Sequence, residues 1–211
     1  MKRKEFLKSL PVVGSAVSLV LGTTTGKSNV HQLPPDGQNP GSPIVLSTWD
    51  FQLPVNQTAL QTLEGGGNIL DAVERSIALV EEDPKITSVG RGGYPDRDGH
   101  LTLDACIMDE KGNAGAVLCL EHIMHPISVA RKVMEKTPHV MLVGDGALQF
   151  AIEQGFPKEN LGTDGAKKAY NNWLKKSGYR PIPDQINHDT IGLIAMDKNG
   201  NIAVKSLDLP Y

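Results

Sequence analysis

The chain has only two cysteines, Cys106 and Cys119, among its 211 residues. Two cysteines are too few for a disulfide-stabilised scaffold, and they lack the Cys-x-x-Cys spacing of a zinc site or a thioredoxin-like redox pair. The sequence also lacks a basic excess, with 21 Lys and Arg against 24 Asp and Glu. This balance gives no reason to expect nucleic acid as a partner, and a small molecule or a protein is expected instead. Whether the two cysteines are bonded stays open at this stage.

No apolar run approaches the ~20 residues that a membrane-spanning helix needs. The candidate run, Leu10 to Leu21, follows a positively charged head of Lys2, Arg3, Lys4 and Lys8. Charge followed by a short apolar stretch is typical of an export signal, and the head resembles a degraded twin-arginine signal. We therefore expect residues 1–28 to be an export signal, no stable membrane span, and a periplasmic or secreted protein. A disordered cytoplasmic tail is the alternative, since no Ala-x-Ala cleavage site is present.

A phosphate-binding loop is imitated by residues 22–28, Gly-Thr-Thr-Thr-Gly-Lys-Ser. Its spacing is one residue short of the motif in which backbone amides cradle phosphates. Prolines and glycines interrupt the residues that follow, where that motif needs a helix to begin. Nucleotide binding is thus the weakest functional hypothesis, and residues 29–43 are interpreted as a linker.

Apolar periodicity predicts a mixed α/β (α+β) domain over residues 44–211. A helix is expected from the N-cap Asn68 to Pro84, and another over Pro126–Lys136, where proline occupies an allowed first-turn position. Strands are expected at 44–46 and 139–143, a turn at 144–146, and further helices at 147–154 and 164–176.

Two hairpins complete the expected elements. Strands at 101–108 and 114–120 are joined by one turn, and strands at 190–196 and 202–204 by another. Both turns have the pattern Met-Asp-x-x-Gly-Asn, in which glycine and asparagine supply the positive φ that such turns need. The strand that begins at Thr190 is nearly all apolar, so we expect it to be buried on both faces, with helices on both sides of the sheets.

The chemically informative segment is His188-Asp189-Thr190, between a proline-containing loop and this strand. If the Thr190 hydroxyl attacks the Asp189 carbonyl, the peptide becomes an ester whose hydrolysis frees a threonine with its own α-amine as base. An α-amine titrates near pH ~8, which suits the acceptance of a hydroxyl proton. Taken alone, a threonine that starts a strand is more often simply a β-branched residue.

A longer series of segments resembles the glycosylasparaginase family of N-terminal-nucleophile hydrolases, in the same order from Ile44 to about Ala203. The segments are Ser47-Thr-Trp49 with Phe51, Gly66 to Glu74, Ser88-Val-Gly, Gly92 to Asp96, Leu103 to Asp109, Pro126 to Glu135, Leu142 to Gly146 and His188 to Gly192. This resemblance implies a four-layer αββα fold with the nucleophile at the start of a central strand.

Residue by residue, the resemblance implies Thr190 as the catalytic nucleophile and Asp189 as the residue that assists self-cleavage. His188 is a candidate to orient Asp189, and Trp49 and Phe51 are candidate aromatic walls of the substrate pocket. A tryptophan or phenylalanine is otherwise most often a core residue. His122 and His125 resemble a metal pair without a third ligand and are interpreted as structural, so no metal or cofactor is expected.

The implied reaction is hydrolysis of the amide that links N-acetylglucosamine to an asparagine side chain. The implied partners are a glycosylasparagine substrate, the chain's own β-subunit from residue 190 onward, and a homodimer of such cleaved units. The related isoaspartyl peptidases and plant-type asparaginases have glycine before the nucleophile, and Asp189 favours the glycosylasparaginase side. Isoaspartyl peptidase or asparaginase activity remains the alternative within the superfamily.

The last residues depart from the family pattern. After Ala203 the family continues into a Thr-Ser-Thr-like stretch and most of a second subunit, whereas this sequence reads Val-Lys-Ser-Leu-Asp-Leu-Pro-Tyr. Without gaps, the family threonine that contacts the nucleophile falls on Asp208. We therefore expect a C-terminally truncated and inactive enzyme, with a non-catalytic remnant of the same fold as the alternative. The coding DNA beyond Tyr211 would distinguish the two.

Overall fold

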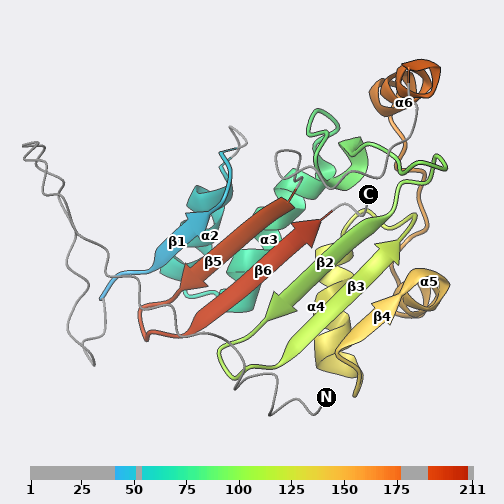
Figure 1. Ribbon diagram of the computed structural model, residues 1–211. Helices are drawn as coiled ribbons and strands as arrows, with labels where there is room; N and C mark the ends of the chain where they lie inside the picture. The colour runs from blue at the N-terminus through green and yellow to red at the C-terminus, as the bar shows by residue number, and fades with distance from the viewer. Residues whose placement is uncertain (1–40, 51–53, 177–189, 209–211) are drawn as a thin grey trace, which may run out of the picture. The chain divides into compact units, whose positions relative to one another are not determined.

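In the part of the chain that the structure describes, six strands form one mixed sheet in the order β1-β5-β6-β2-β3-β4 (Figure 1). The computed structural model describes residues 41–50, 54–176 and 190–208, all within one compact unit, Asp36–Tyr211. The proposed export signal and the phosphate-loop imitation lie outside the described residues. The strands are β1 (Ile44–Ser47), β2 (Leu103–Met108), β3 (Ala114–Leu120), β4 (Met141–Val143), β5 (Thr190–Met196) and β6 (Ile202–Asp208). The helices are α2 (Val55–Glu64), α3 (Ile69–Glu82), the short 3-10 helix η1 (Gly90–Gly92), α4 (Pro126–Lys136), α5 (Gly144–Glu153) and α6 (Asp164–Lys176).

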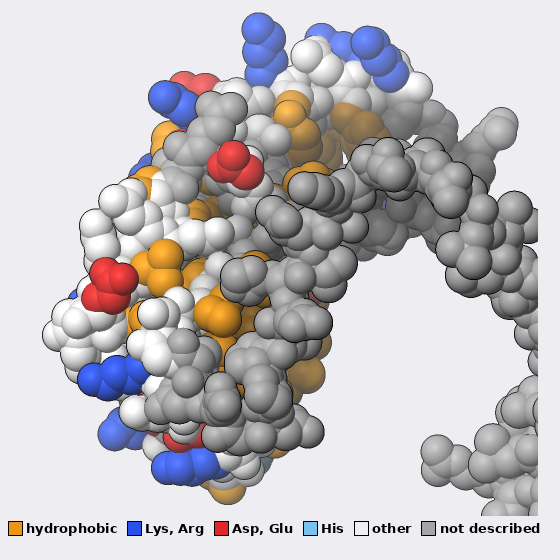
Figure 2. Space-filling model, turned by 90° about the vertical axis from the view of Figure 1, so that its left-hand side faces the viewer, with side chains coloured by type: hydrophobic (Ala, Val, Ile, Leu, Met, Phe, Trp, Pro, Cys, Tyr) orange, Lys and Arg blue, Asp and Glu red, His pale blue; other side chains and the backbone are white. Residues whose placement is uncertain are grey.

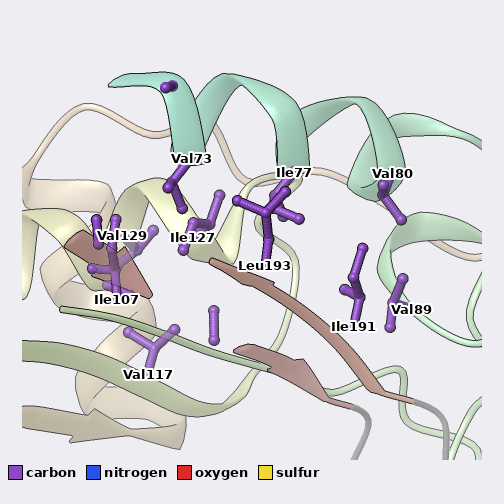
Figure 3. Close-up of a cluster of buried hydrophobic side chains, with 14 of the residues drawn as sticks. Val73, Ile77, Val80, Val89, Ile107, Val117, Ile127, Val129, Ile191 and Leu193 are labelled. Atoms are coloured by element: carbon purple, nitrogen blue, oxygen red, sulfur yellow. The ribbon is translucent and has the colours of Figure 1, made fainter. Parts of the chain in front are cut away.

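Helices α2, α3 and α4 lie behind the same face of the sheet (Figure 1). On that side, Ile77 of α3 points toward Leu193 of β5, and Val80 lies above Ile191 (Figure 3). All four side chains are completely buried. Burial of one such side chain stabilises the fold by about 1.5–3 kcal/mol relative to its exposure, so this layer is the principal core.

The helices predicted from periodicity and capping are confirmed. Asn68 is the N-cap of α3, where its side-chain oxygen accepts a 2.8 Å hydrogen bond from the Asp71 N–H. Helix α4 has the predicted bounds and begins with Pro126. Arg131 of α4 binds Asp71 and Glu74 of α3, at 2.6 Å in each case. The two helices are therefore joined by an ion-pair network as well as by packing.

The two predicted hairpin turns share one hydrogen-bond pattern, which confirms that they use the same chemistry. In the first, Asp109 Oδ1 accepts the backbone N–H groups of Lys111 and Asn113 at 2.9 and 2.8 Å. In the second, Asp197 Oδ1 accepts those of Asn199 and Asn201 at 2.8 and 3.0 Å. The aspartate therefore organises each turn, and the glycine supplies its positive φ.

Several expectations about the elements are wrong. Helix α2 was not predicted, although Val55, Ala59 and Leu63 recur at helical spacing and are buried. Residues 144–146 form the first turn of α5, because Gly144, with φ of 54°, lets the chain pass directly from β4 into the helix. Strand β6 continues beyond Val204 as far as Asp208, where it pairs with β2 and β5.

Strand β5 is buried on one face only, contrary to the prediction. Ile191, Leu193 and Ala195 are completely buried beneath the helices, whereas Ile194 is 46% exposed. In the described part of the chain, the opposite face of the sheet also exposes large apolar side chains of β1, β2, β4 and β6. They are Ile44, Leu46, Met108, Met141, Val143 and Ile202, and together with Ile194 we call them the outer apolar face.

Figure 2 views the molecule from the side of Figure 1 on which β1 forms the sheet edge. Hydrophobic side chains reach the surface in the middle of that side, with charged side chains toward its margins (Figure 2). None of the described helices has the length and apolar character required to cross a membrane. Cys106 and Cys119 are both exposed and are not bonded to each other.

Candidate functional site

Thr190 is the first residue of β5, an interior strand between β1 and β6. Across the sheet it pairs with Asp208 of β6, which in turn pairs with Asp104 of β2. The backbone therefore places Thr190 at the start of an interior strand, and its role as the nucleophile stays a prediction. Asp189, His188 and Phe51 lie outside the described residues, and their predicted roles stay predictions.

The beginning of β5 is held against the end of β1 through Thr48. The Gly192 N–H donates to the Thr48 hydroxyl oxygen at 2.9 Å, and the Thr48 N–H donates to the Gly192 carbonyl oxygen at 3.0 Å. A Cβ at Gly192 would lie only 3.1 Å from the Thr48 methyl carbon, so glycine permits the close approach. This pair fixes the chain two residues after Thr190.

Trp49 follows Thr48 directly, so it is brought to the same end of the sheet as Thr190. Its side chain is 56% exposed, which excludes the alternative of a core tryptophan in this part of the protein. Its carbonyl oxygen accepts a 3.2 Å hydrogen bond from the Ser47 hydroxyl. An exposed aromatic residue at this end of the sheet is compatible with a substrate wall, and the role itself stays a prediction.

The Ser88-Val-Gly segment also approaches this end of the sheet. Val89 is completely buried and lies next to Ile191, the residue that follows Thr190 (Figure 3). Gly90 has φ of 67°, and a Cβ there would collide with the backbone of Glu81. Ser88, half-buried just before this glycine, is thus positioned by a tight backbone crossing.

Sequence reasoning missed the role of Thr48. Thr48 belongs to the family-like segment Ser47-Thr-Trp49, and its partner Gly192 lies 144 positions away in the sequence. A threonine before a tryptophan carries no local signal for such a contact. Only the pairing of β1 with β5 brings the two residues together.

The two histidines that resembled a metal pair bind protein groups instead. The His122 ring contacts the Glu159 carbonyl oxygen at 3.2 Å, and His125 lies between Glu81 and Glu82, at 3.1 Å from each. The hydrogen bond to Glu81 is the main reason that the pKa of His125 is raised. Burial raises the pKa of Glu81, which also accepts the N–H of Ile127 at 3.1 Å. Over the described ranges, no three metal-binding side chains come together.

A model of the asparaginase family matches residues 47–206. The chain is 54% identical over 201 residues to an N(4)-(beta-N-acetylglucosaminyl)-L-asparaginase of Elizabethkingia miricola, in an alignment that covers 95% of this chain and 58% of the relative. A rat protein of the same name is 37% identical, with 79% of this chain and 57% of the relative covered.

The chain also matches a relative from the isoaspartyl peptidase and asparaginase branch. An isoaspartyl peptidase/L-asparaginase of Xenopus laevis is 41% identical over 145 residues, which cover 67% of this chain and 46% of the relative. In each of these comparisons the chain spans less than two thirds of the relative's length. The match over residues 47–206 shows that the chain belongs to the asparaginase family, and it confirms the resemblance to the glycosylasparaginases among the N-terminal-nucleophile hydrolases.

Proposed function

We propose that this chain carries the nucleophile of a glycosylasparaginase, which hydrolyses the amide between N-acetylglucosamine and an asparagine side chain. The observation that carries the proposal is the position of Thr190 as the first residue of the interior strand β5. Thr48 fixes that strand from one side and brings Trp49 to the same end. The names of the Elizabethkingia and rat relatives support the choice of substrate.

The first step is self-cleavage before Thr190. The Thr190 hydroxyl oxygen attacks the Asp189 carbonyl carbon and loses its proton, and the peptide C–N bond breaks as the nitrogen takes up a proton. Water then hydrolyses the resulting ester. The products are a carboxylate on Asp189 and a new α-amino group on Thr190, which becomes the local base.

The second step is hydrolysis of the substrate. The Thr190 hydroxyl gives its proton to the new α-amine and attacks the side-chain amide carbonyl, and the protonated amino sugar leaves. An acyl-threonine ester remains, and water releases aspartate from it. Trp49 would form one wall of the substrate pocket in this proposal.

The outer apolar face supports the finer, four-layer αββα architecture. Side chains such as Leu46, 63% exposed, and Ile194, 46% exposed, project from neighbouring strands in the described residues. A contiguous apolar surface of this kind is typical of a buried interface. We propose that a second sheet covers this face in the assembled enzyme, in which the parts before and after residue 190 remain associated and pair as a homodimer. Export by the signal at residues 1–28 remains part of the proposal.

The experiment combines the 211-residue chain with a polypeptide that supplies the part of the Elizabethkingia relative that the chain does not match. Mass spectrometry should find a product that begins at Thr190, and the mixture should hydrolyse N-acetylglucosaminyl-asparagine. Thr190→Ala should abolish both signals, whereas Thr87→Ala, at an exposed threonine, should leave both unchanged. Hydrolysis of β-aspartyl dipeptides alone would favour the isoaspartyl peptidase alternative. Full glycosylasparagine turnover in Thr190→Ala would refute the proposal.

A further inference from the structure

A hollow of about 480 Å³ lies between the C-terminal end of α3, η1, the loop before α4 and the loop after α5. Its volume falls within the range of small-molecule binding sites, which is about 300–1,000 Å³. The side chains that matter for its chemistry are Glu82, Arg91, Met124, His125, Phe156 and Glu159. Of the residues assigned to the proposed reaction, the two that the structure describes, Thr190 and Trp49, are not part of its lining.

The walls of the hollow are fixed by hydrogen bonds. The Glu159 N–H donates to the His122 carbonyl oxygen at 2.8 Å, and the His122 ring contacts the Glu159 carbonyl oxygen at 3.2 Å. These bonds hold the loop after α5 against the loop before α4. In the same loop before α4, His125 is held between Glu81 and Glu82. A ligand would therefore enter a largely preformed site.

Arg91 is the cation of the hollow without a counterion. Within the described ranges its buried Nε has no hydrogen-bond partner, and its guanidinium group forms no ion pair. Because this Nε is closed off from solvent, a ligand in the hollow would meet the terminal nitrogens of the guanidinium group, which can bind a carboxylate in a bidentate manner. The hollow therefore favours a ligand with a carboxylate directed at Arg91.

The remaining charges disfavour a simple anion. Among the lining residues, Arg91 and protonated His125 provide two positive charges, and Glu82 and Glu159 provide two negative ones. The charges of the lining residues therefore sum to zero, which favours a ligand without net charge. Glu159 lines the hollow and is near enough to contribute to raising the pKa of His125, after the larger effects of Glu81 and Glu82, so its side of the hollow favours a cationic group of a ligand.

We propose that this hollow binds a small α-amino acid with an apolar side chain. The ligand's carboxylate binds Arg91, its ammonium group lies beside Glu159, and its side chain packs against Met124 and Phe156. This assigns a second small-molecule site to the chain, with a ligand different from the glycosylated substrate of the proposed reaction.

The ligand series for the test separates the two charges. Isothermal titration of the 211-residue chain uses L-leucine, 4-methylpentanoate, which lacks the ammonium group, and 3-methylbutylamine, which lacks the carboxylate. Each lost charge-assisted contact should weaken binding about tenfold or more relative to L-leucine. L-Leucine should also raise the melting temperature of the chain, since it binds the folded state.

Two variants assign the contacts. Arg91→Gln should weaken the binding of L-leucine about tenfold or more and leave the binding of 3-methylbutylamine unchanged. Glu159→Gln should weaken the binding of L-leucine, whereas 4-methylpentanoate should bind as tightly as before or more tightly. Arg75→Gln is the matched control, because Arg75 is exposed on α3 and does not line the hollow.

The proposal is rejected if L-leucine binds no more tightly than its two analogues, or shows no saturable binding. It is also rejected if Arg91→Gln, shown by circular dichroism to be folded, binds L-leucine as the unmodified chain does. Should Arg91→Gln not fold, the ligand series and Glu159→Gln decide the outcome.

Discussion

Thr48 and Gly192 form a reciprocal pair of hydrogen bonds between β1 and β5. The Thr48 hydroxyl oxygen accepts the Gly192 N–H at 2.9 Å, and the Gly192 carbonyl oxygen accepts the Thr48 N–H at 3.0 Å. The hydroxyl thus takes the place of a backbone carbonyl just beyond the last paired residue of β1, Ser47. Because Thr190 and Trp49 each lie close in sequence to this pair, it determines where both of them lie.

Thr48→Val should lower the free energy of unfolding by about 1 kcal/mol, because it removes the acceptor of the Gly192 N–H while it keeps the shape of the side chain. Thr48→Ser retains the hydroxyl and should lower the free energy of unfolding by less. Urea denaturation followed by circular dichroism measures both changes. Equal stability of Thr48→Val and the unmodified chain would show that the hydroxyl contact contributes nothing.

Gly192→Ala should lower the free energy of unfolding by more when the Thr48 methyl group is present. The added Cβ would lie 3.1 Å from Thr48 Cγ2, which is closer than an ordinary van der Waals contact. In the Thr48→Ser background that methyl group is absent, so the same substitution should destabilise less. The difference between the two costs is a coupling energy, expected at about 0.5 kcal/mol or more. A coupling energy of zero would mean that Gly192 is required for another reason.

Local signals were sufficient for most of the elements. Asn68 with its cap, Pro126 at a first helical position and the two aspartate turns are determined by neighbours within a few residues, and the structure has them as predicted. The extra length of β6 was missed because a strand continues wherever its neighbours offer backbone groups. Here both β2 and β5 pair with it as far as Asp208.

Burial and long-range contacts were less accessible to sequence reasoning. The nearly all-apolar sequence of β5 predicts burial on both faces of the strand. Ile194 instead faces away from the helix layer and is exposed. The candidate site depended on the family resemblance for Thr190 and Trp49. The surroundings of Arg91 could not be predicted from the sequence. They come from the end of α3, the loop before α4 and the loop after α5, which lie far apart along the chain.

The ion pair between His125 and Glu82 should make a pH-dependent contribution to stability. Glu81 and Glu82 contribute to raising the pKa of His125. The pair is therefore fully formed below the unfolded histidine pKa of about 6.5, and its contribution is lost as the pH rises through the higher folded value. Glu82→Gln should lower the free energy of unfolding by about 0.2–1 kcal/mol at pH ~6, since Glu82 is largely exposed, and by less at pH ~9.

Urea denaturation at both pH values checks the expected decrease. Glu64→Gln is the matched control, because Glu64 is an exposed glutamate of α2 away from His125, and its small effect should be similar at both pH values. A loss in Glu82→Gln that is as large at pH ~9 as at pH ~6 would contradict the assignment.

Lys205 is completely buried at the centre of β6, where it pairs with Leu193 and Ile107. Within the described part of the chain its Nζ has no hydrogen-bond partner. Burial lowers the pKa of its amine to about 7, against a smaller opposing effect of the Glu81 carboxylate. Removal of a lysine charge from water is costly, so Lys205 is expected to destabilise the fold near neutral pH.

The sign of the pH dependence follows from the lowered pKa. Between pH ~7 and pH ~10.5 the unfolded chain binds a proton at this lysine that the folded chain does not, so Lys205 makes stability rise with pH across that window. Its penalty is fully present below pH ~7. Lys205→Met should therefore raise the free energy of unfolding by about 1–4 kcal/mol near pH 7 and flatten the dependence of stability on pH above pH 7.

Glu81 keeps its hydrogen bonds to His125 and Ile127 in this variant. Lys198→Met, at an exposed turn lysine, is the matched control and should change neither quantity. Chemical denaturation from pH ~6 to pH ~10 would contradict the prediction if Lys205→Met were less stable than Lys198→Met with an unchanged slope.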